Sequence, residues 1–351
     1  MTRTSLPNAG HWVLERQHLP QLFSVLQQKG YQLVGPTVRD GAIIYDTITS
    51  VDDLPAGWTD KQEKAFYRLS RRQDEKLFSY TVGPHSWKKF LHPPLLKLWQ
   101  ATREHHKFHI TDTPEEIPRY AFIGVRACEL QAIAIQDKIF MDGHYTDSVY
   151  KQRRENAFVI AVNCDRANAT CFCASMNTGP KATMGFDLAL TEVAQGDRHY
   201  FIVEVGTTQG GDALRQTEAQ PAAEIDKKTA ASISARTAED MGRHLDTGDL
   251  KELLHHNTEH PHWDEVATRC LACANCTMVC PTCFCTTVED VTDLTGDHAE
   301  RWRKWDSCFT MDFSYIHGGS VRASTRARYR QWLTHKLSSW HDQFGTSGCV
   351  G

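Results

Sequence analysis

The chain has 351 residues, of which 40% are hydrophobic and 23% are charged, and its formal net charge is −4. This composition is ordinary for a globular protein, and the length suffices for about two domains. No apolar run approaches the roughly 20 residues of a membrane-spanning helix, and the N-terminus lacks the apolar stretch of a secretory signal. The weak net charge and the lack of any recognition module argue against binding to nucleic acid.

The N-terminal part of the sequence alternates between strand-like and helix-like stretches. A helical spacing over residues 17–29 ends at Gly30. Strands are predicted at 31–34, 42–45, 120–125, 156–162, 188–190 and 200–205, and a helix at 128–140. Buried strands joined through a helix indicate an α/β domain with a mixed sheet that contains at least one parallel pair.

The middle of the chain, residues 209–249, is rich in Ala, Gly, Thr and charged residues. We expect exposed helices there that connect two domains. The Gly206–Gly211 segment just before it matches neither nucleotide-binding glycine motif, so a plain turn is predicted.

The remainder is predicted to be a small ferredoxin-like domain of helices and loops, organised by its cysteines. The expected division is an α/β domain at 1–245, with a cluster of its own if its cysteines converge, and an iron–sulfur domain at 246–351. A helix is predicted at 328–344, with its apolar stripe packed in a core. Surface or capping roles are predicted for the four clustered histidines, which are His255, His256, His260 and His262.

The most informative motif is C-x2-C-x2-C-x3-C-P, formed by Cys270, Cys273, Cys276 and Cys280 with the proline that follows. This is the ligand spacing of bacterial-type 4Fe-4S clusters, in which three thiolates bind one cubane and the fourth usually binds the other cluster of a pair. Structural zinc sites normally use separated pairs of ligands, so zinc is the weaker alternative. A second motif of this type is expected to begin at Cys349 and to be cut off at the C-terminus of this chain.

Four further cysteines lie in the N-terminal part, each just after a predicted strand or in the loop that follows one: Cys128, Cys164, Cys171 and Cys173. The ends of parallel strands converge on one edge of a sheet, so these distant thiols are predicted to share one metal centre. The alternative is a set of buried, unreactive thiols, because free cysteine is often buried. The roles of Cys283, Cys285 and Cys308 stay open between secondary ligands and shielding residues.

Clustered cysteines in a chain of this length argue against a secreted disulfide scaffold and favour a reducing cytoplasm. The charge is also uneven, because residues 301–336 hold eight Lys or Arg and two acidic residues. Such runs are usually a solvated face, although an acidic partner could dock on them.

A family resemblance rests on segments between residues 120 and 351, whereas residues 1–119 match only loosely. These segments are Gly124–Cys128 with Asp137, Cys164 with Cys171–Met176, His260–Asp264, Cys270–Cys285, Trp305–Cys308 and His317–Gly319. Together they resemble the beta (iron–sulfur) subunit of soluble NAD(P)-linked nickel–iron (NiFe) hydrogenases of the sulfhydrogenase type. They are also similar to the A subunit of anaerobic sulfite reductase.

The resemblance implies an iron–sulfur electron-transfer subunit with two or three 4Fe-4S clusters and no catalytic residues of its own. It would relay electrons between a flavin- and NAD(P)H-binding subunit and the small and large subunits of a NiFe hydrogenase. The equivalent partner in the alternative is the catalytic subunit of a sulfite or sulfur reductase. A stand-alone flavin-containing oxidoreductase and a zinc-stabilised scaffold are the other hypotheses.

Overall fold

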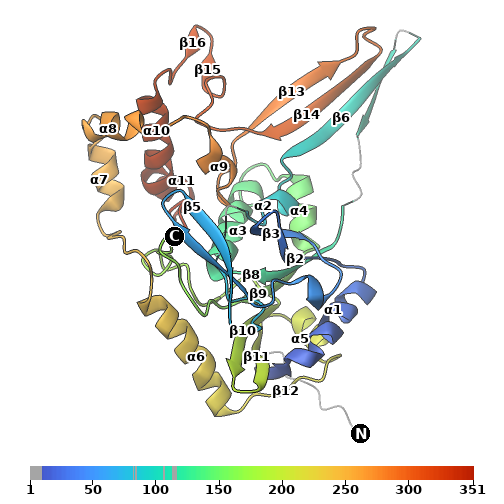
Figure 1. Ribbon diagram of the computed structural model, residues 1–351. Helices are drawn as coiled ribbons and strands as arrows, with labels where there is room; N and C mark the ends of the chain where they lie inside the picture. Colours follow the sequence, from blue (N-terminus) through green and yellow to red (C-terminus); the bar gives the residue numbers. More distant parts are fainter. Residues whose placement is uncertain (1–9, 82, 84, 106, 113–116) are drawn as a thin grey trace.

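An eight-stranded mixed sheet is the centre of the N-terminal part of the protein in the computed structural model, which describes residues 10–351 except 82, 84, 106 and 113–116 (Figure 1). In spatial order its strands are β12 (Gln220–Pro221), β1 (His11–Glu15), β11 (Arg198–Val205), β10 (Leu188–Gln195), β9 (Phe158–Val162), β8 (Tyr120–Val125), β2 (Gln32–Arg39) and β3 (Ala42–Thr47). The inner strands β2, β8, β9 and β10 run parallel, and the outer strands pair antiparallel. The predicted α/β domain with a mixed sheet is thereby confirmed.

Helices cover both faces of this sheet because side chains alternate along each strand. On β8, Ala121 and Ile123 face α1 (Leu19–Gln28) and α5 (Thr208–Leu214). Phe122 faces the opposite side, which is covered by three helices: α2 (Lys88–Leu91), α3 (Ala127–Phe140) and α4 (Ser148–Glu155). The long α6 (Glu224–Glu239) places Ile233 against Ile202 of β11. The sheet therefore has an apolar core on each side, as both-face burial of parallel strands requires.

A second, four-stranded antiparallel sheet is built from two distant parts of the chain. Its order is β13 (Thr286–Thr292), β14 (His298–Trp305), β6 (Leu95–Glu104) and β7 (Lys107–Asp112). These long hairpins project from the rest of the molecule (Figure 1). Two smaller hairpins are β4 (Trp58–Glu63) with β5 (Phe66–Arg71), and β15 (Tyr315–Ile316) with β16 (Gly319–Ser320).

The cysteine-rich C-terminal part is mainly helical. Its short helices are α7 (Leu250–His256), α8 (His262–Thr268) and α9 (Asn275–Met278). A longer helical rod runs through α10 (Thr325–Thr334), a π-helical segment (His335–Ser339) and α11 (Trp340–Phe344). Trp340 is buried with Ile135 and Ala132 of α3, so this rod packs directly on the N-terminal domain. The described residues also form two short 3₁₀ segments, Arg16–His18 and Val51–Asp53.

Most predicted elements are present, and the differences are informative. The predicted helices at 17–29, 128–140 and 328–344 and the six predicted strands are confirmed within a few residues. The segment at 209–249 was expected to be exposed throughout, but Ala213 and Leu214 of α5 are fully buried against the sheet. The β13–β14 hairpin had no predicted counterpart, and its pairing with β6 joins strands from both sides of the expected division at residue 245. In the described part of the chain, no helix combines the length and hydrophobicity that a membrane crossing requires.

The contact between α5 and the start of β10 gives a test of the fold. A methyl group at Gly210 would lie 2.1 Å from the Asp187 carbonyl oxygen, whereas one at Gly211 would lie 3.5 Å from Val205. We expect Gly210→Ala to lower the free energy of unfolding by about 1–3 kcal/mol, because overpacking displaces backbone. Gly211→Ala is the matched control and should be neutral or stabilising by up to about 1 kcal/mol, since alanine is the better helix former. Chemical denaturation measures both, and equal stabilities of the two variants would contradict this packing.

Candidate iron–sulfur centres

The four N-terminal cysteines meet at the edge of the large sheet, as parallel strand ends allow. Cys128 is the second residue of α3, directly after β8, and Cys164 follows the end of the neighbouring β9. Cys171 and Cys173 come from the loop between β9 and β10. All four line one cavity of about 330 Å³. Sequence reasoning therefore brought the right thiols together, and their role as ligands of one centre remains a prediction.

The thiols are close enough to influence one another electrostatically. Burial raises the pKa of Cys128 well above its usual value, and the negative charges of Glu129, Cys164, Cys173 and Cys171 raise it further. Burial also raises the pKa of Cys173 to about 12, again with contributions from Cys164 and Cys171. The raised pKa values favour the protonated thiols, as is expected when thiols gather in a protein interior. A bound metal would reverse this preference, because coordination deprotonates the thiol.

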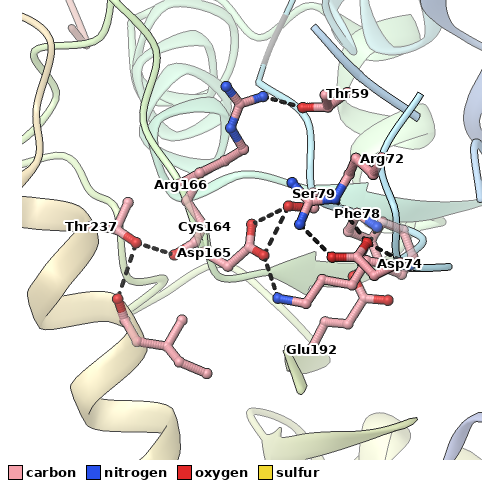
Figure 2. A network of polar contacts seen from close by, with 12 residues as sticks. Thr59, Arg72, Asp74, Phe78, Ser79, Cys164, Asp165, Arg166, Glu192 and Thr237 are labelled. Atoms are coloured by element: carbon pink, nitrogen blue, oxygen red, sulfur yellow. Dashed lines mark hydrogen bonds and ion pairs between the residues drawn. The ribbon is translucent and has the colours of Figure 1, made fainter. Parts of the chain in front are cut away.

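A polar network fixes the chain around Cys164 (Figure 2). The carboxylate of Asp165 accepts hydrogen bonds from Lys76 Nζ at 2.7 Å and from Ser79 Oγ at 2.9 Å. On the other side, Thr237 Oγ1 of α6 donates to the Cys164 carbonyl oxygen at 3.0 Å. Arg166 donates to Thr59 and to the backbone of Asp60. The Cys164 loop is thus tied to three separate elements, which limits how far its thiol can move.

The C-terminal motif is split in space. Cys270 and Cys273 lie on the loop between α8 and α9, where Ala272 and Ala274 adopt positive φ angles of 51° and 64°, and Cys276 is the second residue of α9. These two left-handed residues make the loop turn sharply between the cysteines. Burial raises the pKa of Cys276, and the negative charges of Cys270 and Cys273 raise it further. Cys273 and Cys276 are exposed at the surface.

Cys308, whose role the sequence left open, lies near this loop, because its neighbour Ser307 hydrogen-bonds to Thr277, the residue after Cys276. Burial raises the pKa of Cys308 to about 12, with further contributions from Cys285 and Cys276. Burial likewise raises the pKa of Cys285, and the negative charge of Asp306 raises it further. Cys308 is therefore placed near the three-cysteine loop and is a candidate for an additional ligand there.

Cys280 is directed to the other side, into the cavity of the N-terminal cysteines. Cys349 lines the same cavity, so six cysteines surround it. The Cys280 sulfur accepts a hydrogen bond from Lys336 Nζ at 3.3 Å and lies within hydrogen-bond distance, 3.2 Å, of Thr282 Oγ1. The neighbouring Cys283 thiol, together with Lys336, holds the pKa of Cys280 well below its usual value. A ready thiolate at this position suits metal binding, because the thiolate is the ligand form.

Buried cations near these sulfurs are the functional residues that sequence reasoning missed. Lys336 is 5% exposed, and besides Cys280 it donates to Thr282 Oγ1 and to the Gly348 carbonyl oxygen. Lys88 is 4% exposed and donates to the carbonyl oxygens of Met278 and Cys283. Burial lowers the pKa of Lys88 to about 8, although the thiols around it oppose this shift. Arg126 is 1% exposed and follows β8 at the same sheet edge as Cys164, which follows the neighbouring β9. No spacing signals such residues, because their partners are far away in sequence.

The thiol set and these cations fit a 4Fe-4S cluster better than a single metal ion. Within the described residues, no group of three or more His, Cys, Asp or Glu side chains is compact enough to hold one ion. The four thiolates of a cubane each bind a different iron, so they lie farther apart than the ligands of a single ion. A cluster with four thiolates also carries net negative charge, which buried cations without carboxylate partners can balance.

All eight Lys and Arg residues of the basic segment at 301–336 have partners within the chain, and five of them pair with acidic residues. Arg301 pairs with Asp290, Lys304 with Glu289, and Arg303 with Asp147. Arg326 and Arg330 both pair with Glu259. The remaining members, Arg322, Arg328 and Lys336, donate to groups of their own domain. The histidines are exposed as predicted, and His256 and His262 contact nearby glutamates.

Comparisons with known proteins agree with the geometry of the cysteines. Residues 269–351 match the family model described as a 4Fe-4S dicluster domain. The C-terminal part of the chain is a 4Fe-4S dicluster domain. Over 341 residues the chain is 26% identical to sulfhydrogenase 2 subunit beta of Pyrococcus furiosus, which covers 96% of this chain and 91% of that relative. No solved structure matches the chain.

Two predictions from the sequence are confirmed by these matches. The resemblance to beta iron–sulfur subunits of sulfhydrogenases holds, because it extends over nearly the whole chain. The predicted ferredoxin-like iron–sulfur domain corresponds to the dicluster domain. These matches support an iron–sulfur electron-transfer subunit that binds 4Fe-4S clusters.

The exposed loop of the dicluster domain provides a direct test. We expect Cys273→Ser to abolish one cubane signal in the electron paramagnetic resonance spectrum of the reduced protein, because serine does not replace the central thiolate of the loop. Leu271→Ala is the control, since Leu271 is 89% exposed in the same loop and its loss should leave the signal intact. An unchanged spectrum for Cys273→Ser would remove this loop from the set of cluster ligands.

Proposed function

We propose that the protein relays electrons between a flavin- and NAD(P)H-binding subunit and the catalytic module of a NiFe hydrogenase in the cytoplasm. The relative from Pyrococcus furiosus is named as a subunit of a sulfhydrogenase, which supports a role inside a complex. The observation that carries the proposal is the placement of two cysteine sets in series. One set lies on the surface loop of Cys270–Cys276, and the other surrounds the inner cavity.

A relay needs centres that approach one another and approach the surface. Cys276 and Cys280 are both in the same motif, yet they face different cysteine groups, so a short stretch of chain bridges the two sets. The inner group combines Cys280 and Cys349 of the dicluster domain with the four N-terminal cysteines. We infer up to three clusters: one on the surface loop, one that uses Cys280 and Cys349, and one held by the N-terminal set. The division at residue 245 is proposed to separate the N-terminal set from the dicluster domain.

The N-terminal set is the least expected of these centres, and metal analysis tests it. We expect Cys164→Ser to lower the iron and acid-labile sulfide content of the anaerobically purified protein by the equivalent of one cubane. Cys273→Ser should cause a loss of similar size, and the double variant should lose both. Ser175→Ala, in the same loop as Cys171, is a control that keeps the thiols. An iron content unaffected by Cys164→Ser would mean that the N-terminal thiols are structural, and zinc without sulfide would support a zinc scaffold.

The relay itself is tested in the intact complex from the native source. We expect NAD(P)H to drive hydrogen formation in the complex, and the isolated chain to show no activity with hydrogen. Cys273→Ser should abolish the NAD(P)H-linked reaction, while hydrogen oxidation with an artificial dye at the catalytic subunit continues. The dye bypasses the relay, so this difference separates a broken relay from a damaged catalytic subunit.

The alternatives give different results in the same experiment. Sulfite-dependent oxidation of NAD(P)H by the complex, without hydrogen formation, would favour the relay subunit of a sulfite or sulfur reductase. A flavin absorption band in the isolated chain, together with NAD(P)H oxidation, would favour a stand-alone oxidoreductase.

A further inference from the structure

Arg126 is a buried cation whose hydrogen bonds are incompletely satisfied. It precedes α3, its side chain is 1% exposed, and its Nη2 donates to the carbonyl oxygens of Phe78 and Tyr80. Its guanidinium carbon lies 4.7 Å from the centre of the Tyr80 ring. The other two nitrogens, Nε and Nη1, are buried and have no hydrogen-bond partner among the described residues. A guanidinium in this state is strongly unfavourable unless a negative group compensates it.

The nearby carboxylates are engaged elsewhere. Glu129 Oε2 accepts hydrogen bonds from the Tyr45 hydroxyl at 3.0 Å and from the Arg126 backbone N–H at 2.9 Å. Neither oxygen of Glu129 partners the Arg126 side chain, because Oε2 takes the two bonds just described and Oε1 is buried without a hydrogen-bond partner among the described residues. Asp165 forms its ion pair with Lys76 at 2.7 Å. No carboxylate of the described residues forms an ion pair with Arg126.

Arg126 lies at the sheet edge where the N-terminal cysteines gather, because it directly follows β8 and Cys164 follows the parallel neighbour β9. Burial alone would lower the pKa of Arg126, and the charge of Cys164 is the largest of the influences that raise it. Cys128 lies two residues after Arg126 and lines the same cavity as Cys164. The polar network around Asp165 and Arg166 holds Cys164 in this position (Figure 2). Lys336, which lines the cavity, differs because its contacts with Cys280, Thr282 and Gly348 already use its three N–H groups.

We propose that Arg126 is the counter-cation of the centre held by Cys128, Cys164, Cys171 and Cys173, and that it raises the reduction potential of this centre. The inference rests on the proposed function, because it requires a cluster at these thiols. Reduction adds one electron and therefore one negative charge to such a centre, with no bond made or broken. A fixed positive charge beside the sulfurs stabilises the reduced form more than the oxidised form, and charge and hydrogen bonds to sulfur are known determinants of cluster potentials. Arg126 is thus a positioning and tuning residue.

A potentiometric titration of the anaerobic complex, followed by electron paramagnetic resonance, tests this role. We expect Arg126→Met to lower the reduced-to-oxidised ratio of one centre at least tenfold at a fixed potential, which is a downward shift of about 59 mV for a one-electron couple. The potentials of the other centres should stay unchanged. Arg126→Gln, which is also neutral, should shift the potential of the same centre in the same direction. It replaces Arg126→Met in the titration if the methionine variant does not fold. Arg126→Lys keeps the charge and should restore most of the potential.

Two controls separate the possible failures. Cys164→Ser identifies which signal belongs to the N-terminal set, and if it removes no signal, the proposed N-terminal centre is wrong. If Cys164→Ser does remove a signal, the N-terminal centre exists. If the potential of that signal is then the same in the wild type, Arg126→Met and Arg126→Gln, Arg126 is not its counter-cation. Arg153→Met removes another buried arginine, one that donates to the Phe90 carbonyl oxygen, and should shift no potential. A merely structural role for Arg126 would reduce the amount of cluster without moving its potential, and that result would also overturn the proposal.

Discussion

The parallel pairing of β8 with β9 is the constraint on which the inner site depends. It sets the end of each strand at the same edge of the sheet, so that Cys128 and Cys164 come together although 35 residues separate them. The loop after β9 then returns Cys171 and Cys173 to this edge before β10 begins. The dicluster domain approaches the same edge and adds Cys280 and Cys349. A slip of either strand would separate the thiols, because each residue of register moves a strand end by about 3.3 Å.

Electrostatics explains why cations, not carboxylates, accompany these sulfurs. Gathering thiols in a protein interior favours their protonated state, as the raised pKa values of Cys128 and Cys173 indicate. A cluster needs thiolates, so the protein has to supply positive charge at a place where water cannot reach. Lys336, which lines the cavity, and Arg126, two residues before Cys128, are both buried and supply this charge without acting as metal ligands. The same charges that help the thiols to bind metal also affect how easily the bound centre accepts an electron.

The sequence was sufficient for the chemistry of the site and for the central sheet, and insufficient for its surroundings. The C-x2-C-x2-C-x3-C-P spacing is a local property, because neighbouring residues of one loop bind one cluster. The sequence predicted strands that end shortly before Cys128 and Cys164, because the apolar runs there have the length and composition of buried strands. In contrast, the split of the motif between two sites depends on the path of the chain after Cys276, and no periodicity encodes that path. Arg126, Lys88 and Lys336 are equally unpredictable, because an isolated Lys or Arg in a sequence is usually on the surface.

The β13–β14 hairpin was missed for a related reason. Its sequence, with Glu289, Asp290, Arg301 and Arg303, alternates charges and has few of the apolar residues that mark a strand. Cross-strand ion pairs such as Arg301 with Asp290 replace the usual apolar contacts on this exposed sheet. The acidic partners of residues 301–336 were equally hard to foresee, since Asp290, Glu289, Asp147 and Glu259 all lie outside that range.

The pairing of β14 with β6 has a consequence for how the protein is made. During synthesis on the ribosome, β6 and β7 emerge early and form a hairpin, but one edge of β6 has no neighbour until residues 298–305 have been translated. About two hundred residues of chain must be synthesised in the meantime, which takes on the order of 10–40 s at the usual rates of translation. An uncovered strand edge is a template for pairing with other chains. The nascent protein therefore passes through an interval in which association with a chaperone, or with a partner subunit, would protect this edge from aggregation.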